Sequence, residues 1–194
     1  MYGDEENLRQ LISFLLYVED SGTMDSWHDE MRAGGAFYST GVKGAVGLMF
    51  PEADVGIIYS VYAEFARRRQ WLTLDRELTT DEYGAMVDEV AAWSGDRSWQ
   101  DILATFGQPS VLFGGTNPRY GKTLGYATGR AGDPMICFHL WNGSEPGQPE
   151  TWPVYDDPIL LAVRRGNAPF EKCLSFTPEG TRRRPPLPEW YVDG

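Results

Sequence analysis

The sequence predicts an α+β domain in which a helical N-terminal half packs on one face of a four- or five-stranded antiparallel sheet from the C-terminal half. Apolar residues recur at helical spacing in residues 1–107, and after Pro109 their spacing changes to two, which is typical of strands. The predicted strands are joined by short connections rich in Gly, Asn, Asp and Pro, as antiparallel hairpins are. We expect the 194 residues to form a single domain, 1–194.

Two long helices are expected early in the chain. The first follows Asp4, a suitable N-cap. One face of this helix is marked by apolar residues at helical spacing, Leu8, Leu11, Ile12, Leu15 and Leu16. The second follows Pro51, which can occupy a first helical turn, and ends at the arginine triplet 67–69, because cations favour a helix C-terminus.

Two further helices complete the mainly helical segment 1–107. The third is capped by Thr80, and the fourth, over 99–106, begins with a capping box formed by Ser98 and Asp101. Residues 34–50 remain open between helix and strand, because their glycines weaken both structures.

The segment 108–180 is predicted to be mainly antiparallel strands. The strands are expected over 124–128, 134–141, 158–165 and 170–177, with 111–113 as a short edge strand. Both faces of 134–141 are apolar, so this strand is predicted to be central in the sheet. The proline-rich residues 181–194 are predicted to form an extended tail.

The net charge of −11 is concentrated in the first half of the chain, where residues 1–97 hold 18 acids and 8 bases. This balance argues against nucleic acid and anionic membranes as partners, because both are bound by clustered Lys and Arg. The charge fits either a solvated helical surface or an acidic face for a basic protein partner. For the second interpretation, the candidate contacts are Asp20, Asp25, Asp29 and Glu30.

The loop 115–123 has the glycines and the Lys-Thr pair of a phosphate-binding P-loop, but not its spacing. The P-loop has four residues between its first Gly and the Gly-Lys pair. Five residues stand there in this chain, and a predicted strand follows where the P-loop requires a helix. We therefore interpret 115–123 as a rigid connection into the sheet, in which Arg119, Tyr120 and Lys122 could line a ligand pocket.

Cys137, His139 and Cys173 are the candidate soft metal ligands. In a sheet of consecutive strands, the strand 158–165 separates the two cysteines by roughly 10 Å, which is beyond the reach of a shared zinc ion or a disulfide. We therefore expect no metal, no cofactor and no disulfide. His139 has a second interpretation as a general acid or base together with Asp133, since a histidine titrates near neutral pH.

The two cysteines and the acidic N-terminal residues favour a cytoplasmic protein without a secretory signal. The excess of 14 Arg over 3 Lys suggests a bacterial origin. Oligomeric state is not predicted.

Two functions remain open. The first is an acidic binding protein, such as an inhibitor of the antitoxin or immunity type, that presents an acidic face to a basic partner. The alternative is a small-molecule enzyme or ligand-binding protein with a pocket around 114–123 and His139. One deep cavity lined by His139 and Arg119 would favour the alternative, whereas an acidic surface without such a cavity would favour the binding protein.

Overall fold

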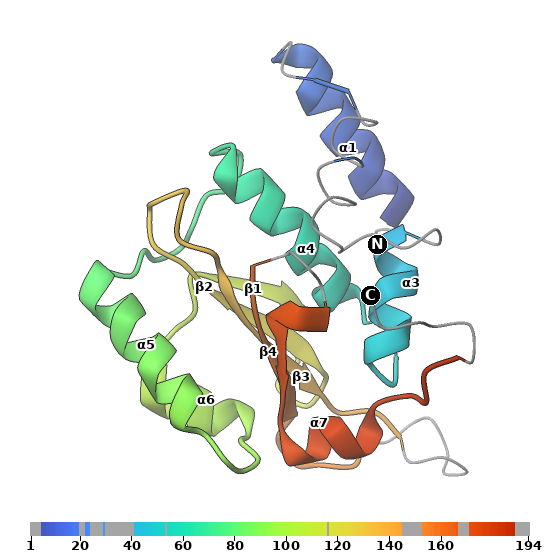
Figure 1. The fold of residues 1–194 in the computed structure, drawn as a ribbon, viewed down its shortest axis with the longest axis vertical. Helices are drawn as coiled ribbons and strands as arrows, with labels where there is room; N and C mark the ends of the chain where they lie inside the picture. The colour runs from blue at the N-terminus through green and yellow to red at the C-terminus, as the bar shows by residue number, and fades with distance from the viewer. Residues whose placement is uncertain are drawn as a thin grey trace.

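A five-stranded antiparallel sheet lies between two groups of helices in the computed structural model of this chain (Figure 1). The structure describes residues 5–19, 22–23, 29, 41–52, 54–115, 117–144, 153–166 and 171–188. The helices of these ranges are α1 (Glu5–Val18), α3 (Gly41–Met49), α4 (Val55–Arg68), α5 (Thr80–Ala92), α6 (Trp99–Phe106) and α7 (Pro178–Arg183). The strands are β1 (Val111–Gly114), β2 (Lys122–Tyr126), β3 (Ile136–Trp141), β4 (Ile159–Arg165) and β5 (Leu174–Phe176). The predicted α+β class is confirmed.

The sheet is a meander in which each strand pairs with the next, in the order β1-β2-β3-β4-β5. The predicted central strand is β3, and all of its residues are buried. A bulge between His139 and Leu140 shifts the register of β3 on β4 by one residue. The last predicted strand, 170–177, is shorter than expected, because a 3-10 turn over Glu171–Cys173 precedes β5.

Helices α3 and α4 cover one face of the sheet. Val61 and Phe65 of α4 belong to an apolar cluster that also contains Trp141 and Leu161 from the strands. Behind α4, α1 contributes Ile12 to the same cluster and extends away from the sheet (Figure 1).

Helices α5 and α6 cover the opposite face of the sheet (Figure 1). Met86 of α5 and Ile102 of α6 belong to a second cluster that contains Leu124, Phe138 and Leu160. The expectation that all helices pack on one face is therefore wrong. The physical reason is the central strand itself, because a strand with two apolar faces needs cover on both sides.

Two of the predicted helix starts are displaced. The N-cap of α5 is Thr79 rather than Thr80, and Thr79 forms a capping box with Glu82. The N-cap of α4 is Asp54, whose carboxylate accepts a hydrogen bond from the Gly56 N–H at 2.7 Å, so Pro51 precedes the helix. The capping box of Ser98 and Asp101 at α6 is confirmed.

The segment 34–50, left open above, contains α3. This helix forms despite its glycines because five of its nine residues are buried against α4 and the sheet. Burial of its apolar face therefore outweighs the low helix propensity of glycine.

At the C-terminal end, α7 packs directly on β4. A Cβ at Gly180 would overlap the carbonyl of Leu161, so only glycine permits this close approach. The predicted extended tail begins later than expected, since residues 181–183 belong to α7. Residues 189–194 and the predicted N-cap Asp4 lie outside the described residues. No helix in the described ranges is long and apolar enough to cross a membrane.

Candidate functional site

His139 is buried in the middle of the molecule, with 1% of its surface exposed. Its Nδ1 atom lies 2.9 Å from the hydroxyl of Thr123 on β2, and the Phe50 ring meets it edge-on with the ring centroids 5.4 Å apart. Burial, with a smaller contribution from the cation of Arg164, holds the pKa of His139 well below its usual value. His139 is therefore a neutral core residue that solvent does not reach.

Asp133 does not lie beside His139. It precedes β3, whereas His139 is close to the other end of that strand, so about 20 Å of extended chain separates them. The carboxylate of Asp133 accepts a hydrogen bond from the Thr128 hydroxyl at 2.9 Å and lies 3.8 Å from the Arg130 guanidinium. The structure thus does not bring the predicted acid–base pair together.

The three residues predicted to bind a ligand differ in burial, and one of them, Lys122, is the first residue of β2. Arg119 and Tyr120 are exposed. Lys122 is 1% exposed, and its Nζ donates to the Asn117 carbonyl at 2.8 Å and lies 3.9 Å from the Trp99 ring centroid. Burial lowers the pKa of Lys122. The buried amine of Lys122 therefore holds the loop through the Asn117 carbonyl, whereas the side chains of Arg119 and Tyr120 are exposed to solvent.

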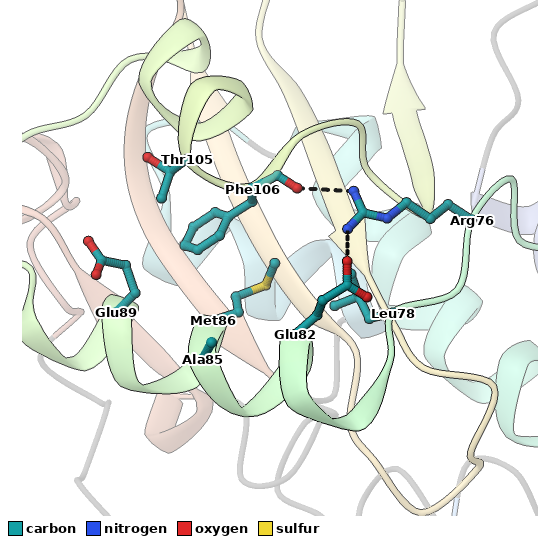
Figure 2. Close-up of a pocket in the computed structure, with 8 residues that line it drawn as sticks. All are labelled: Arg76, Leu78, Glu82, Ala85, Met86, Glu89, Thr105 and Phe106. Carbon is teal, nitrogen blue, oxygen red and sulfur yellow. Dashed lines mark hydrogen bonds and ion pairs between the residues drawn. The ribbon is translucent and has the colours of Figure 1, made fainter.

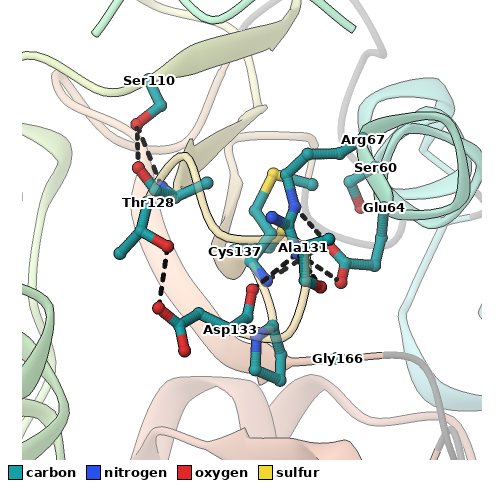
Figure 3. Close-up of polar contacts among 12 residues, drawn as sticks. Ser60, Glu64, Arg67, Ser110, Thr128, Ala131, Asp133, Cys137 and Gly166 are labelled. Atoms are coloured by element: carbon teal, nitrogen blue, oxygen red, sulfur yellow. Dashed lines mark hydrogen bonds and ion pairs between the residues drawn. The ribbon is translucent and has the colours of Figure 1, made fainter. Parts of the chain in front are cut away.

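A buried polar cluster joins α4 to the connection between β2 and β3 (Figure 3). Arg67 makes a two-pronged ion pair with Glu64, with both N···O distances 3.0 Å, and its guanidinium also donates to the carbonyls of Arg130 and Asp133. Glu64 in turn accepts a hydrogen bond from the N–H of Met135 at 3.1 Å. These contacts tie α4 to the residues that connect β2 to β3, and we call the cluster a structural clamp.

Cys137 lies close to this clamp and is fully buried. Its thiol accepts a hydrogen bond from Arg164 at 3.3 Å, and burial raises its pKa. A thiol with a raised pKa and no exposure is a poor nucleophile. In the described part of the chain, no three His, Cys, Asp or Glu side chains lie close enough to hold a metal ion.

The exposed acids of the described chain concentrate around α5 and α6. Residues 75–101 hold eight acids and two bases, a net charge of −6 out of the chain's −11. All eight acids are exposed, and we call this set the α5–α6 acidic face. Its members are Asp75, Glu77, Asp81, Glu82, Asp88, Glu89, Asp96 and Asp101.

The two arginines of this segment are only half exposed because both are held against the protein. Arg76 donates to the carbonyls of Phe106 and Gln108, both at 3.0 Å, and pairs with Glu82 at 2.9 Å. The guanidinium of Arg97 lies 5.3 Å from the Trp93 ring centroid and donates to the backbone of Asp96. The surface that remains is dominated by carboxylates.

A hollow of about 320 Å³ opens within this face, between α5 and α6 (Figure 2). Its walls include the apolar side chains Leu78, Met86 and Phe106. The carboxylates of Glu82 and Glu89 stand on either side of Met86, two helical turns apart on α5 (Figure 2). The hollow therefore combines an apolar wall with Glu89 at one end and the Glu82–Arg76 ion pair at the other.

Two smaller hollows, of about 310 and 280 Å³, lie on the other side of α5, against β4 and β5. They share Val90, Trp93, Val163 and Ser175, so they form parts of one groove. None of the three hollows is lined by His139, Arg119 or Lys122.

The acids predicted to contact a partner are only partly described. Asp29 is exposed, whereas Asp20, Asp25 and Glu30 lie outside the described residues. Sequence reasoning found the acidic half but assigned no role to residues 75–101. The signal was present, since the acids of this segment recur at 81, 82, 88 and 89, a spacing that keeps them off the apolar side of one helix.

Comparisons with protein-family models, with curated proteins and with solved structures found no match to this chain.

Proposed function

We propose that this protein is a non-catalytic binding protein, such as an inhibitor of the antitoxin or immunity type, that uses the α5–α6 acidic face to dock onto a basic protein partner. One observation carries the proposal: residues 75–101 expose eight carboxylates, whereas the guanidiniums of their two arginines are bound to their own protein. A partner with a basic surface would meet the excess negative charge of these residues. Such complementarity accelerates association and rejects acidic competitors.

The alternative, a small-molecule enzyme, has weaker support. It requires His139 to reach a substrate near Arg119 and Lys122. His139 and Lys122 are instead buried among protein partners, and Arg119 is turned outward. Electrostatic complementarity is therefore the better-supported basis for function.

The proposal can be tested by affinity capture from cells that express the protein naturally, with mass spectrometry of the retained proteins. Two variants each remove four negative charges. The face variant carries substitutions in the acidic face at positions without a described side-chain hydrogen bond, namely Asp75→Asn, Glu77→Gln, Asp81→Asn and Asp88→Asn. The matched variant neutralises the N-terminal candidates, Asp20→Asn, Asp25→Asn, Asp29→Asn and Glu30→Gln.

We expect the wild-type protein and the matched variant to retain the same basic proteins, and the face variant to lose them. Circular dichroism and melting curves must first show that both variants fold. Retention by the face variant with loss by the matched variant would move the docking face to the N-terminal acids. Retention by both variants, or capture of no basic protein, would refute the proposed function.

A further inference from the structure

The hollow between α5 and α6 has the chemistry of a receptor for one long cationic side chain. We propose, on the basis of the function proposed above, that it anchors an arginine side chain of the basic partner, with the guanidinium against Phe106 and paired with Glu89. The inference follows from the walls of the hollow, the free capacity of Glu89 and the way this protein holds its own arginines.

The walls suit the two parts of an arginine. Ala85, Met86 and Leu78 provide apolar surface for the three-carbon stem, which long basic side chains bury while their charged ends stay paired or solvated. Phe106 provides a ring, and guanidinium groups stack on aromatic rings more readily than ammonium groups do. The volume of about 320 Å³ is at the lower limit for small-molecule sites, which suits a side chain better than a whole ligand.

The two acidic ends of the hollow are not equivalent. Glu82 is occupied, since it pairs with Arg76 and accepts a hydrogen bond from the Thr79 N–H at 2.7 Å. Glu89 accepts one hydrogen bond, from the Trp93 indole at 3.1 Å, and among the described residues its second oxygen receives none. Glu82 and Glu89 are seven residues apart, about 10 Å along the helix, so a cation beside Glu89 does not compete with Arg76 for the Glu82 carboxylate. The guanidinium of the partner's arginine is therefore expected beside Glu89.

The protein already holds one of its own arginines in this manner. The guanidinium of Arg183 lies 3.8 Å from the Trp141 ring centroid and is paired with the Glu179 carboxylate. Glu89 and Phe106 offer an incoming arginine the same pairing of carboxylate and ring (Figure 2). The hollow can therefore bind arginine by contacts that are already present elsewhere in this fold.

The experiment uses two peptides of equal length and charge, acetyl-(Gly-Arg)4-amide and acetyl-(Gly-Lys)4-amide, titrated into the full-length protein by calorimetry and by amide NMR. The test variant is Glu89→Gln, which keeps an oxygen for Trp93 but removes the charge. The matched control is Asp88→Asn, which removes the same charge from an adjacent exposed residue that does not line the hollow. A second variant, Phe106→Leu, removes the ring.

We expect the arginine peptide to bind about fivefold more tightly than the lysine peptide, since stacking favours the guanidinium. Glu89→Gln should weaken the arginine peptide about fivefold and Asp88→Asn less than about twofold, since only Glu89 contacts the bound group. Phe106→Leu should abolish the preference for arginine over lysine. The amide shifts should centre on Ala85, Met86, Thr105 and Phe106.

Equal binding of the two peptides, with equal effects of Glu89→Gln and Asp88→Asn, would overturn the inference and leave the proposed function intact, since the face would then act only through its overall charge. Shifts centred on the groove lined by Val90 and Ser175 would also overturn it. If neither peptide binds while the wild-type protein still captures basic proteins, the inference fails alone. If that capture fails as well, both proposals fail.

Discussion

Removing the charge of Glu64 should destabilise the protein far more than removing the charge of an exposed glutamate. The side chains of Glu64 and Arg67 are each only 4% exposed, so Glu64→Gln removes the negative charge that balances a buried guanidinium and leaves it a neutral amide oxygen and backbone carbonyls as acceptors. Breaking one partner of a buried ion pair costs about 3–5 kcal/mol. Because the carbonyls still solvate Arg67, we expect the lower end, about 3 kcal/mol in the free energy of unfolding.

Three variants and one control turn this expectation into a measurement. Arg67→Met should cost about 4 kcal/mol, since it strands a buried carboxylate and frees the carbonyls of the β2–β3 connection. The double variant removes both charges and should cost about 2 kcal/mol less than the sum of the single losses. The control is Glu6→Gln, which breaks an exposed pair with Arg9 at 3.8 Å and should cost less than about 0.5 kcal/mol.

Urea unfolding followed by tryptophan fluorescence gives the four free energies, since the chain has seven Trp. For a chain of this length a loss of 3 kcal/mol also corresponds to a decrease in Tm of roughly 6–12 °C. Single losses below about 1 kcal/mol, or additivity within about 0.5 kcal/mol, would show that the clamp does not act as a buried charge pair.

Three further predictions concern titratable groups. Because burial lowers the pKa of His139 below 6.5, the unfolded chain binds more protons in acid, so stability is complete above about pH 6.5 and declines below it by up to about 1.4 kcal/mol per pH unit. His139→Gln should flatten that decline in urea titrations at pH 5–7. Cys137→Ser should cost about 1–3 kcal/mol, more than Cys173→Ser, because it places a more polar hydroxyl at a fully buried position. The Cys137 thiol should react with Ellman's reagent only after denaturation. Hydrogen bonding to Arg182 lowers the pKa of Glu179 to about 2, so its stabilising contribution is complete above about pH 4.5 and is lost toward pH 2. Between about pH 4.5 and pH 2, the melting temperature of Glu179→Gln should therefore decrease less than that of the wild-type protein.

Local signals in the sequence located most of the secondary structure. The capping box at Ser98 placed the start of α6 correctly, because its two hydrogen bonds involve residues only three apart. At α5 two threonines stand side by side, and Thr79 rather than Thr80 has the glutamate three residues later that completes a box. Burial against α4 and the sheet makes α3 a helix, and no local pattern contains that information.

The candidate site was harder to predict because the surroundings of a side chain come from distant segments. Lys122 was selected as part of the loop 115–123 and His139 for its side-chain chemistry, but both pack against rings from other segments, Trp99 and Phe50. The two-sided cover of the sheet could have been inferred, since the apolarity of both faces of 134–141 already required it. The hollow at Met86 joins two helices across a loop, and periodicity within one helix does not reveal it.

The order of helices and strands has a consequence for synthesis on the ribosome. Helices α1 to α6 end at Phe106, and the strands that bury their apolar faces begin at Val111 and end at Phe176. At roughly 5–20 residues per second, translation of the roughly 70 residues from the end of α6 to the end of β5 takes about 4–14 s. During that interval the sheet that covers Met86 and Ile102 on one side and Phe65 on the other is still incomplete. The nascent chain should therefore depend on chaperones until β5 emerges, and a fragment that stops after α6 should aggregate rather than fold.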